Sequence, residues 1–183
     1  MGDVAHFRAI PWCAAHLEKA ASPTLVFKTP AIRFPRDDYK DVLMSSILNR
    51  PDAMANFAVF YDESKDPKEP VTEVSAFITL GHMLNGWEGV CHGGIVMTLL
   101  DEVSGQLGEI NVAKGAIPNF PIMTAYLNTS FIAPVETGTT ILVKAKETKR
   151  EGRKWYIDAT VESEDGTLLA KAEALFVQLK AKL

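Results

Sequence analysis

The chain has 183 residues, of which 47% are hydrophobic and 23% charged, with a formal net charge of −4. This composition is typical of one folded domain with a full hydrophobic core, and it shows no repeat or low-complexity segment. The acidic balance argues against nucleic acid as a main partner, and no apolar run is long enough for a transmembrane helix, so we expect neither nucleic-acid nor membrane binding.

The first part of the chain, residues 1–55, is expected to form an N-terminal arm with a short helix, ahead of a globular unit at residues 56–183. Apolar residues around Trp12 favour one or two amphipathic turns, which cap a pocket, pack on a neighbouring subunit or remain loosely packed. Farther on, acids followed by apolar residues at helical spacing predict a short helix from Asp37 that stops at Pro51.

Two strands and a long apolar helix are predicted next. Residues 57–62 and 74–80 have strand character and are joined by a polar loop with two prolines. Residues 92–108 begin as His-Gly-Gly and continue as a helix that is apolar over most of its circumference, as expected of a helix wrapped by a sheet. Asp101 is a carboxylate in the interior of this helix.

The glycine turn and Asp101 are the candidate reactive groups. Glycines allow the backbone to approach a ligand closely, and the first free N–H groups of a helix can polarise a carbonyl oxygen. Gly93 and Asp101 are eight residues apart, which places them about 12 Å apart along the helix axis. One carbonyl cannot contact both, so a shared reaction requires Asp101 from a second antiparallel copy and predicts an obligate homodimer. The alternative is a polar residue at a dimer contact without a catalytic role.

The C-terminal half is predicted to be antiparallel sheet. Residues 122–131, 155–162 and 168–179 have strand character, with hairpin turns at residues 149–154 and at Asp165-Gly166. These strands need a helix to cover them, and residues 92–108 are the best candidate. In the first strand, alternation places four polar or aromatic residues on one face suited to a polar site: Thr124, Tyr126, Asn128 and Ser130.

The His-Gly-Gly turn, with an acid nine residues after the histidine and long antiparallel strands behind it, resembles the PaaI-like group of hot-dog acyl-CoA thioesterases. The resemblance covers about residues 56–180, and four later residues fall in step with it: Asn128, Phe131, Pro134 and Gly138. It implies an α+β hot-dog fold, in which a curved antiparallel sheet wraps a long central helix. It also implies homodimers that often associate as tetramers made of two dimers.

The resemblance implies a role for each matching residue. Asp101 would be the base that activates water, or the nucleophile, and Thr124 would help to hold the water near this acid. The Gly93 N–H would polarise the thioester carbonyl, and His92 would shape the turn. Further candidates for substrate binding are Gly94, Asn85, Glu88, Asn128 and the cations Lys149, Arg150 and Arg153.

Two features leave alternatives open. Many relatives have Asn or Gln where this chain has Gly86, so the third polar group is unassigned between Asn85 and Glu88, and Glu88 is either a second acid or a solvated loop charge. The basic hairpin at residues 149–154 either meets the CoA phosphates or is merely solvated. The candidates for lining the acyl pocket are Trp87, Met97, Leu100, Tyr126 and the arm around Trp12.

The expected function is hydrolysis of an acyl-CoA thioester to free acid and CoA, without a metal or redox cofactor. The alternatives are an acyl-carrier-protein thioesterase of a fatty-acid or polyketide pathway, a lyase, isomerase or hydratase of the same fold, and a non-catalytic acyl-CoA-binding protein. Cys13 and Cys91 are too few for a disulfide framework or metal site. Residues Ala181-Lys182-Leu183 resemble the Ser-Lys-Leu address, which predicts a peroxisomal location in a eukaryote and a cytoplasmic one otherwise.

Overall fold

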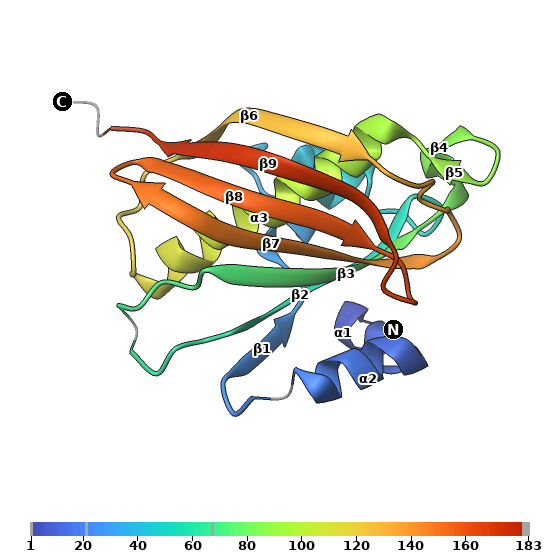
Figure 1. Ribbon diagram of the computed structural model, residues 1–183, viewed down its shortest axis with the longest axis horizontal. Helices are drawn as coiled ribbons and strands as arrows, with labels where there is room; N and C mark the ends of the chain where they lie inside the picture. Colours follow the sequence, from blue (N-terminus) through green and yellow to red (C-terminus); the bar gives the residue numbers. More distant parts are fainter. Residues whose placement is uncertain (1, 21, 67, 181–183) are drawn as a thin grey trace.

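The computed structural model describes residues 2–20, 22–66 and 68–180. Within these residues, a seven-stranded antiparallel sheet with the order β1-β2-β3-β7-β8-β9-β6 curves around one long helix, α3 (Gly93–Lys114) (Figure 1). This is the α+β arrangement that the sequence predicted. The strands of the sheet are β1 (Leu25–Lys28), β2 (Met54–Asp62), β3 (Glu73–Leu80), β6 (Ile122–Phe131), β7 (Thr140–Glu151), β8 (Lys154–Glu162) and β9 (Leu168–Gln178).

Helix α3 packs its apolar side against the inner face of the sheet and forms the centre of the main core. Leu99, Leu100, Val103 and Leu107 are each 0% exposed, and full burial of such side chains stabilises the fold by about 1.5 to 3 kcal/mol each. Gly115 ends the helix with a left-handed φ of 75°, as a glycine after a helix commonly does.

The N-terminal segment is a packed part of the fold rather than a loose arm. Helices α1 (Asp3–Arg8) and α2 (Pro11–Lys19) cover the outer face of the sheet, opposite α3 (Figure 1). Phe7 and Cys13 are 0% exposed there and pack with Phe60 and Phe77 of the sheet. The expected boundary after residue 55 also falls inside β2, and β1 joins the sheet as an edge strand beside β2.

The helix predicted between Asp37 and Pro51 is wrong in type and extent. The structure has a short 3-10 turn, η1 (Ala31–Arg33), and a single π-helical turn, η2 (Leu43–Ile47). Tyr39 and Asp41 have positive φ angles of 58° and 57°. This left-handed backbone cannot continue a right-handed helix, so the apolar spacing forms only one turn.

A β-bulge in β6 changes which side chains face the helix. The pairing of β6 with β9 shifts between Thr124 and Tyr126, which leaves Ala125 as an extra residue. Because a bulge reverses the alternation of side chains, Thr124 faces α3, whereas Tyr126, Asn128 and Ser130 face outward. The prediction that these four residues share a face is therefore wrong.

The two predicted hairpin turns are confirmed at Gly152 and Gly166, where φ is 58° and 83°. None of the helices in the described part of the chain has the length and apolarity to cross a bilayer. The predicted peroxisomal address, Ala181-Lys182-Leu183, lies outside the described residues.

Candidate functional site

The start of α3 presents one free backbone donor. A small hairpin of β4 (Asn85–Trp87) and β5 (Val90–Cys91) leads into the helix, and His92 is its N-cap. The Gly94 N–H donates to the His92 Nδ1 atom at 2.9 Å, and the N–H groups of Ile95 and Val96 donate to the His92 carbonyl oxygen. Among the hydrogen bonds of the described residues, the Gly93 N–H has no partner, so it remains available to a ligand.

The Gly94 N–H is used by His92 and is not free for substrate, so a role for Gly94 in substrate binding stays a prediction. The same hydrogen bond also defines the state of the His92 ring. Because Nδ1 accepts a hydrogen bond, a neutral imidazole carries its proton on Nε2. His92 thus caps the helix and blocks the second amide, which leaves a site with one backbone donor, Gly93.

The backbone of the loop before the helix leaves no room for a side chain at Gly86. A Cβ atom on Gly86 would lie 2.8 Å from the Cα atom of His92, so a side chain would displace the turn. Neighbouring Asn85 points elsewhere: its Oδ1 accepts a hydrogen bond from the Thr137 hydroxyl at 2.5 Å, and Thr137 also contacts His82 Nδ1 at 3.2 Å. Asn85 therefore does not replace the missing amide and instead joins this loop to the segment before β7.

Asp101 and Thr124 form the second half of the candidate site. The Thr124 hydroxyl donates to Asp101 Oδ1 at 2.8 Å, a contact that the bulge at Ala125 makes possible by turning Thr124 inward. The adjacent Glu102 is partly buried, and burial, followed by repulsion from Asp101 and other acids, raises its pKa to about 7. The sequence identified Asp101 and Thr124 but did not indicate that the two would be in direct contact.

Gly93 and Asp101 lie on the same uninterrupted helix, so their separation along its axis is about 12 Å. Within one chain, the amide and the carboxylate cannot act on the same carbonyl group. The described residues of a single chain therefore contain two half-sites, one around Gly93 and one around the Asp101–Thr124 pair.

An apolar cavity of about 260 Å³ opens beside Gly93. Its wall includes buried Cys91 and Val135, and burial raises the pKa of the Cys91 thiol to about 11, so this group is neutral at physiological pH. None of Trp87, Met97, Leu100, Tyr126 and Trp12, the residues expected to line an acyl pocket, is among those that line it in the described structure. Its lining residues are Val90, Cys91, Gly93, Val96 and the run Phe131, Ile132, Ala133, Pro134 and Val135.

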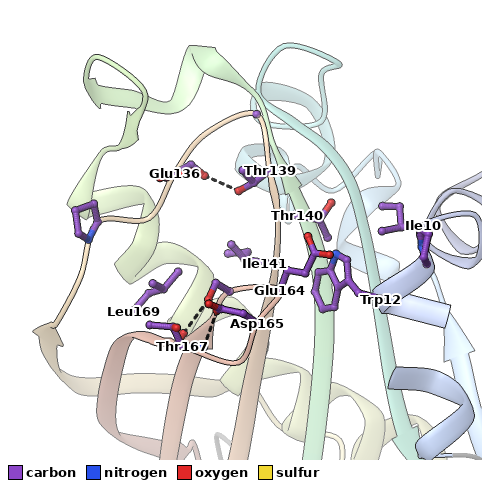
Figure 2. Close-up of a pocket in the computed structure, with 14 residues that line it drawn as sticks. Ile10, Trp12, Glu136, Thr139, Thr140, Ile141, Glu164, Asp165, Thr167 and Leu169 are labelled. Carbon is purple, nitrogen blue, oxygen red and sulfur yellow. Dashed lines mark hydrogen bonds between the residues drawn. The ribbon is translucent and has the colours of Figure 1, made fainter. Parts of the chain in front are cut away.

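A larger cavity of about 1060 Å³ lies between the start of α2 and two loops, one that precedes β7 and one that joins β8 to β9 (Figure 2). Ile10 and Trp12 lie on one side of it, and Thr167 and Leu169 lie on the other. Its lining, within the described part of the chain, includes none of the predicted catalytic residues. The larger cavity shares Pro134 with the cavity beside Gly93, but neither Gly93 nor Asp101 lines it.

The predicted CoA-binding cations have partners within the chain. Lys149 pairs with Glu151 at 2.6 Å, and Arg150 pairs with Glu147 and lies over the Trp155 ring at 3.9 Å. Arg153 donates to the Gln178 carbonyl oxygen at 2.8 Å. Lys149 and Arg150 are therefore paired with acids, whereas Arg153 is held by a neutral carbonyl group.

Asn128 and Glu88 also lie apart from the half-sites. Asn128 faces outward on β6, and it lines a polar depression on the outer face of the sheet together with Lys171 and Glu173. Glu88 is exposed in the turn between β4 and β5. Neither side chain is brought to Gly93 or Asp101 by contacts within this chain.

Comparison with known proteins finds a family match over part of the chain and several relatives. Residues 88–170 match the thioesterase superfamily. The chain is 32% identical over 100 residues to the acyl-coenzyme A thioesterase THEM4 of Xenopus laevis, a match that covers 54% of this chain and 42% of that protein. The chain spans less than half the length of the THEM4 relatives that it matches.

Two solved structures show the same fold. The PaaI protein of E. coli, from the phenylacetic acid degradation operon, has a TM-score of 0.52 and 13% identity, covering 59% of this chain and 73% of that one. A protein of Streptococcus mutans solved with acetyl CoA also has a TM-score of 0.52, with 20% identity over 61% of this chain and 85% of that one. The predicted resemblance to hot-dog thioesterases is confirmed.

Proposed function

This chain carries a thioesterase-superfamily domain with the hot-dog fold, and from this premise we propose that it hydrolyses an acyl-CoA thioester to a free acid and CoA. The observation that carries the proposal is the free N–H of Gly93 at the start of α3, beside an apolar cavity. A thioester oxygen at this point accepts the N–H and lies at the positive end of the helix dipole, where the charge that develops during hydrolysis is stabilised.

The proposed reaction uses three groups of the chain. The Asp101 carboxylate takes a proton from water as the water oxygen attacks the carbonyl carbon, and the Thr124 hydroxyl keeps this carboxylate oriented. The oxyanion of the tetrahedral intermediate accepts the Gly93 N–H. The carbon–sulfur bond then breaks, and the CoA sulfur leaves with the proton from Asp101. Direct attack by Asp101 through a mixed anhydride, which water then hydrolyses, uses the same three groups.

The separation of the half-sites leads us to propose that they combine across a homodimer. Gly93 and Asp101 lie on either side of Met97 along α3, and Thr124 and Phe131 lie on either side of Leu127 along β6. A two-fold axis near Met97 and Leu127 reverses both elements. It brings Asp101 of the partner subunit toward Gly93, and Thr124 of the partner subunit toward Phe131.

Two surface features support this dimer. Strand β6 is at the edge of the sheet, so one side of its backbone is available to pair with a second β6 strand. Apolar side chains are exposed along the same region, including Met97 at 37%, Phe131 at 55% and Ile132 at 52%. Pairing of two such copies gives a continuous sheet and covers this surface. A tetramer would then be a dimer of dimers.

The test removes one group at a time. Gly93→Pro deletes the N–H, and proline is well accepted at the first position of a helix after an extended residue such as His92. Gly93→Ala is the matched control because it keeps the N–H and adds a Cβ atom in ordinary contact with Phe131. With a thiol-release assay, we expect Gly93→Pro and Asp101→Asn to lose about a hundredfold or more in kcat, and Gly93→Ala to lose much less. Wild-type turnover in Asp101→Asn would reject the mechanism.

The contacts that these cations make within the chain give a specific reason to test an acyl carrier protein as the donor. Lys149, Arg150 and Arg153 are all engaged within the chain, so the cluster expected to hold the CoA phosphates is occupied. Hydrolysis of one acyl group is therefore compared on CoA and on a carrier protein. We expect the higher kcat/KM with CoA, and a strong preference for the carrier would replace the proposed substrate.

A further inference from the structure

The cavity beside Gly93 bears on which acyl groups the proposed thioesterase accepts. We propose that this cavity receives a straight acyl chain of short to medium length, and that Phe131 and Ala133 set the accepted length. The proposal rests on the proposed hydrolysis of a thioester at Gly93. It adds a substrate class and two residues that determine it.

Position is the first argument. Gly93 both lines the cavity and carries the free N–H that the thioester oxygen would accept. A carbonyl oxygen held by this N–H is about 3 Å from the nitrogen, and the first acyl carbon is bonded to the same carbonyl carbon. In the proposed pose, the acyl carbon is the substituent that enters the cavity, and the CoA sulfur is the substituent that faces away from it.

The chemistry of the wall is the second argument. Val96, Val135 and Cys91 are at most 6% exposed and present hydrocarbon or a neutral thiol. Burial of a methylene group against such a wall contributes about 0.8 kcal/mol, which corresponds to about a fourfold gain in affinity for each added carbon that fits. The cavity thus favours hydrocarbon and offers no charge to a polar acyl group.

The volume of the cavity limits the length of the acyl chain that it can hold. A volume of about 260 Å³ holds eight or nine groups of the size of water, at about 30 Å³ each. A methylene group is of similar size, so an octanoyl chain fills the space. Longer chains have to displace the wall or project into solvent, and the fourfold gain for each carbon ends there.

The Phe131 ring lies at the end of the cavity where Gly93 is. Its Cε1 and Cζ atoms lie 3.4 Å from the position that a Cβ atom on Gly93 would occupy, so the ring stands against the thioester position. Because Phe131 is 55% exposed and ends β6, its removal widens the mouth without emptying the main core. Ala133, two residues farther along, is partly buried on the same wall, and a larger side chain there fills the cavity.

The first experiment measures kcat/KM for straight-chain acyl-CoAs from acetyl to palmitoyl. We expect the wild type to improve up to about octanoyl and to lose about tenfold by palmitoyl. Phe131→Ala should move the optimum to longer chains, and Ala133→Leu should reduce octanoyl hydrolysis about tenfold while acetyl hydrolysis is retained. Phe34→Ala is the control, because it removes an exposed aromatic ring that neither lines the cavity nor lies on β6. Equal rates for octanoyl-CoA and palmitoyl-CoA, or variants with unchanged profiles, would overturn the proposal.

The second experiment separates this proposal from the proposed activity. Non-hydrolysable S-alkyl-CoA thioethers, from ethyl to hexadecyl, are titrated into the wild type and into Ala133→Leu by calorimetry. We expect octyl-CoA to bind the wild type more tightly than ethyl-CoA, and this difference to fall about tenfold in Ala133→Leu. Chain-dependent binding without thiol release would contradict only the hydrolase function. Thiol release with binding that ignores chain length would contradict only the acyl-pocket assignment.

Discussion

At the residue scale, the contact between Thr124 and Asp101 links the sheet to the helix at the proposed reaction centre. The hydroxyl donates to the carboxylate at 2.8 Å, and this requires the bulge at Ala125. A charged acceptor makes this a stronger hydrogen bond than one between neutral groups. The orientation of the carboxylate thus depends on a residue outside the helix that carries it.

Thr124→Val should lower kcat about tenfold to a hundredfold with little change in KM, because valine has nearly the same shape but cannot donate to Asp101. Thr124→Ser is the matched control, since it keeps the hydroxyl and should retain most of the turnover. Steady-state kinetics with one acyl-CoA measure both variants. Equal rates in the valine variant and the wild type would show that the contact has no part in catalysis.

Glu102 should make the stability of the fold depend on pH. Burial raises its pKa from the ordinary value of 4.5 to about 7, so the folded state binds a proton that the unfolded state has released between these values. The free energy of unfolding therefore falls as pH rises through this interval, and the cost persists above it. In urea titrations, Glu102→Gln should be more stable than the wild type by up to about 3 kcal/mol near pH 8, with a smaller difference near pH 5.

The control for Glu102→Gln is Glu173→Gln, which removes an exposed charge from the outer face of the sheet. Asp101, Glu109 and Asp41 are the other acids that raise the Glu102 pKa, and they are present in both variants. A Glu102→Gln variant whose stability differs from the wild type by the same amount at both pH values would contradict the assignment.

At the element scale, different helices cover the two faces of the sheet, and only the helix on the inner face carries proposed catalytic groups. Helix α3 covers the inner face and carries Gly93 and Asp101, whereas α1 and α2 cover the outer face over β2 and β3. The aromatic cluster on the outer face includes Phe7, Phe60 and Phe77, with the last two rings stacked at 4.9 Å. A substitution in this aromatic cluster should therefore lower the stability of the fold and leave kcat nearly unchanged.

Phe7→Ala tests this separation. Phe7 is 0% exposed, and loss of a buried phenylalanine from such a core costs about 3 to 5 kcal/mol of stability. We expect a lower Tm, measured by calorimetry, with kcat near that of the wild type at a temperature where the variant is folded. A folded variant that has lost its turnover would show that the outer layer acts on the site.

At the scale of the whole molecule, the proposed mechanism requires the proposed dimer. Each chain holds one amide half-site and one carboxylate half-site, about 12 Å apart along α3. If the half-sites combine between chains, defects in different half-sites should complement each other. If each chain acts alone, they should not.

Co-expression of Gly93→Pro with Asp101→Asn, on chains with different tags, makes this comparison. In a mixed dimer, one site carries both defects and the other carries neither. Random pairing gives one half of the dimers as mixed, so the pool should recover about a quarter of the wild-type activity. Activity no greater than that of the two parent variants, in a pool shown to contain mixed dimers, would exclude sites shared between chains.

The sequence by itself predicted the central helix, the strands at residues 57–62, 74–80, 122–131, 155–162 and 168–179, and the candidate reactive groups. Apolar residues around most of residues 92–108 require a covering sheet, and strand alternation with Asp165-Gly166 defines antiparallel hairpins. The positions of Gly93 and Asp101 on one helix followed from its 1.5 Å rise for each residue. These features depend on residues close together in the chain, so the hydrophobic period and the residue spacing of one segment predict them well.

Only the tertiary structure decided how side chains and N–H groups are used. The bulge at Ala125 separates Thr124 from Asn128 although simple alternation puts them together. His92 binds the Gly94 N–H, so only the Gly93 N–H stays free. The physical reason is that strand register and capping depend on contacts between segments far apart or on competition among donors, and neither is encoded in the period of a single segment.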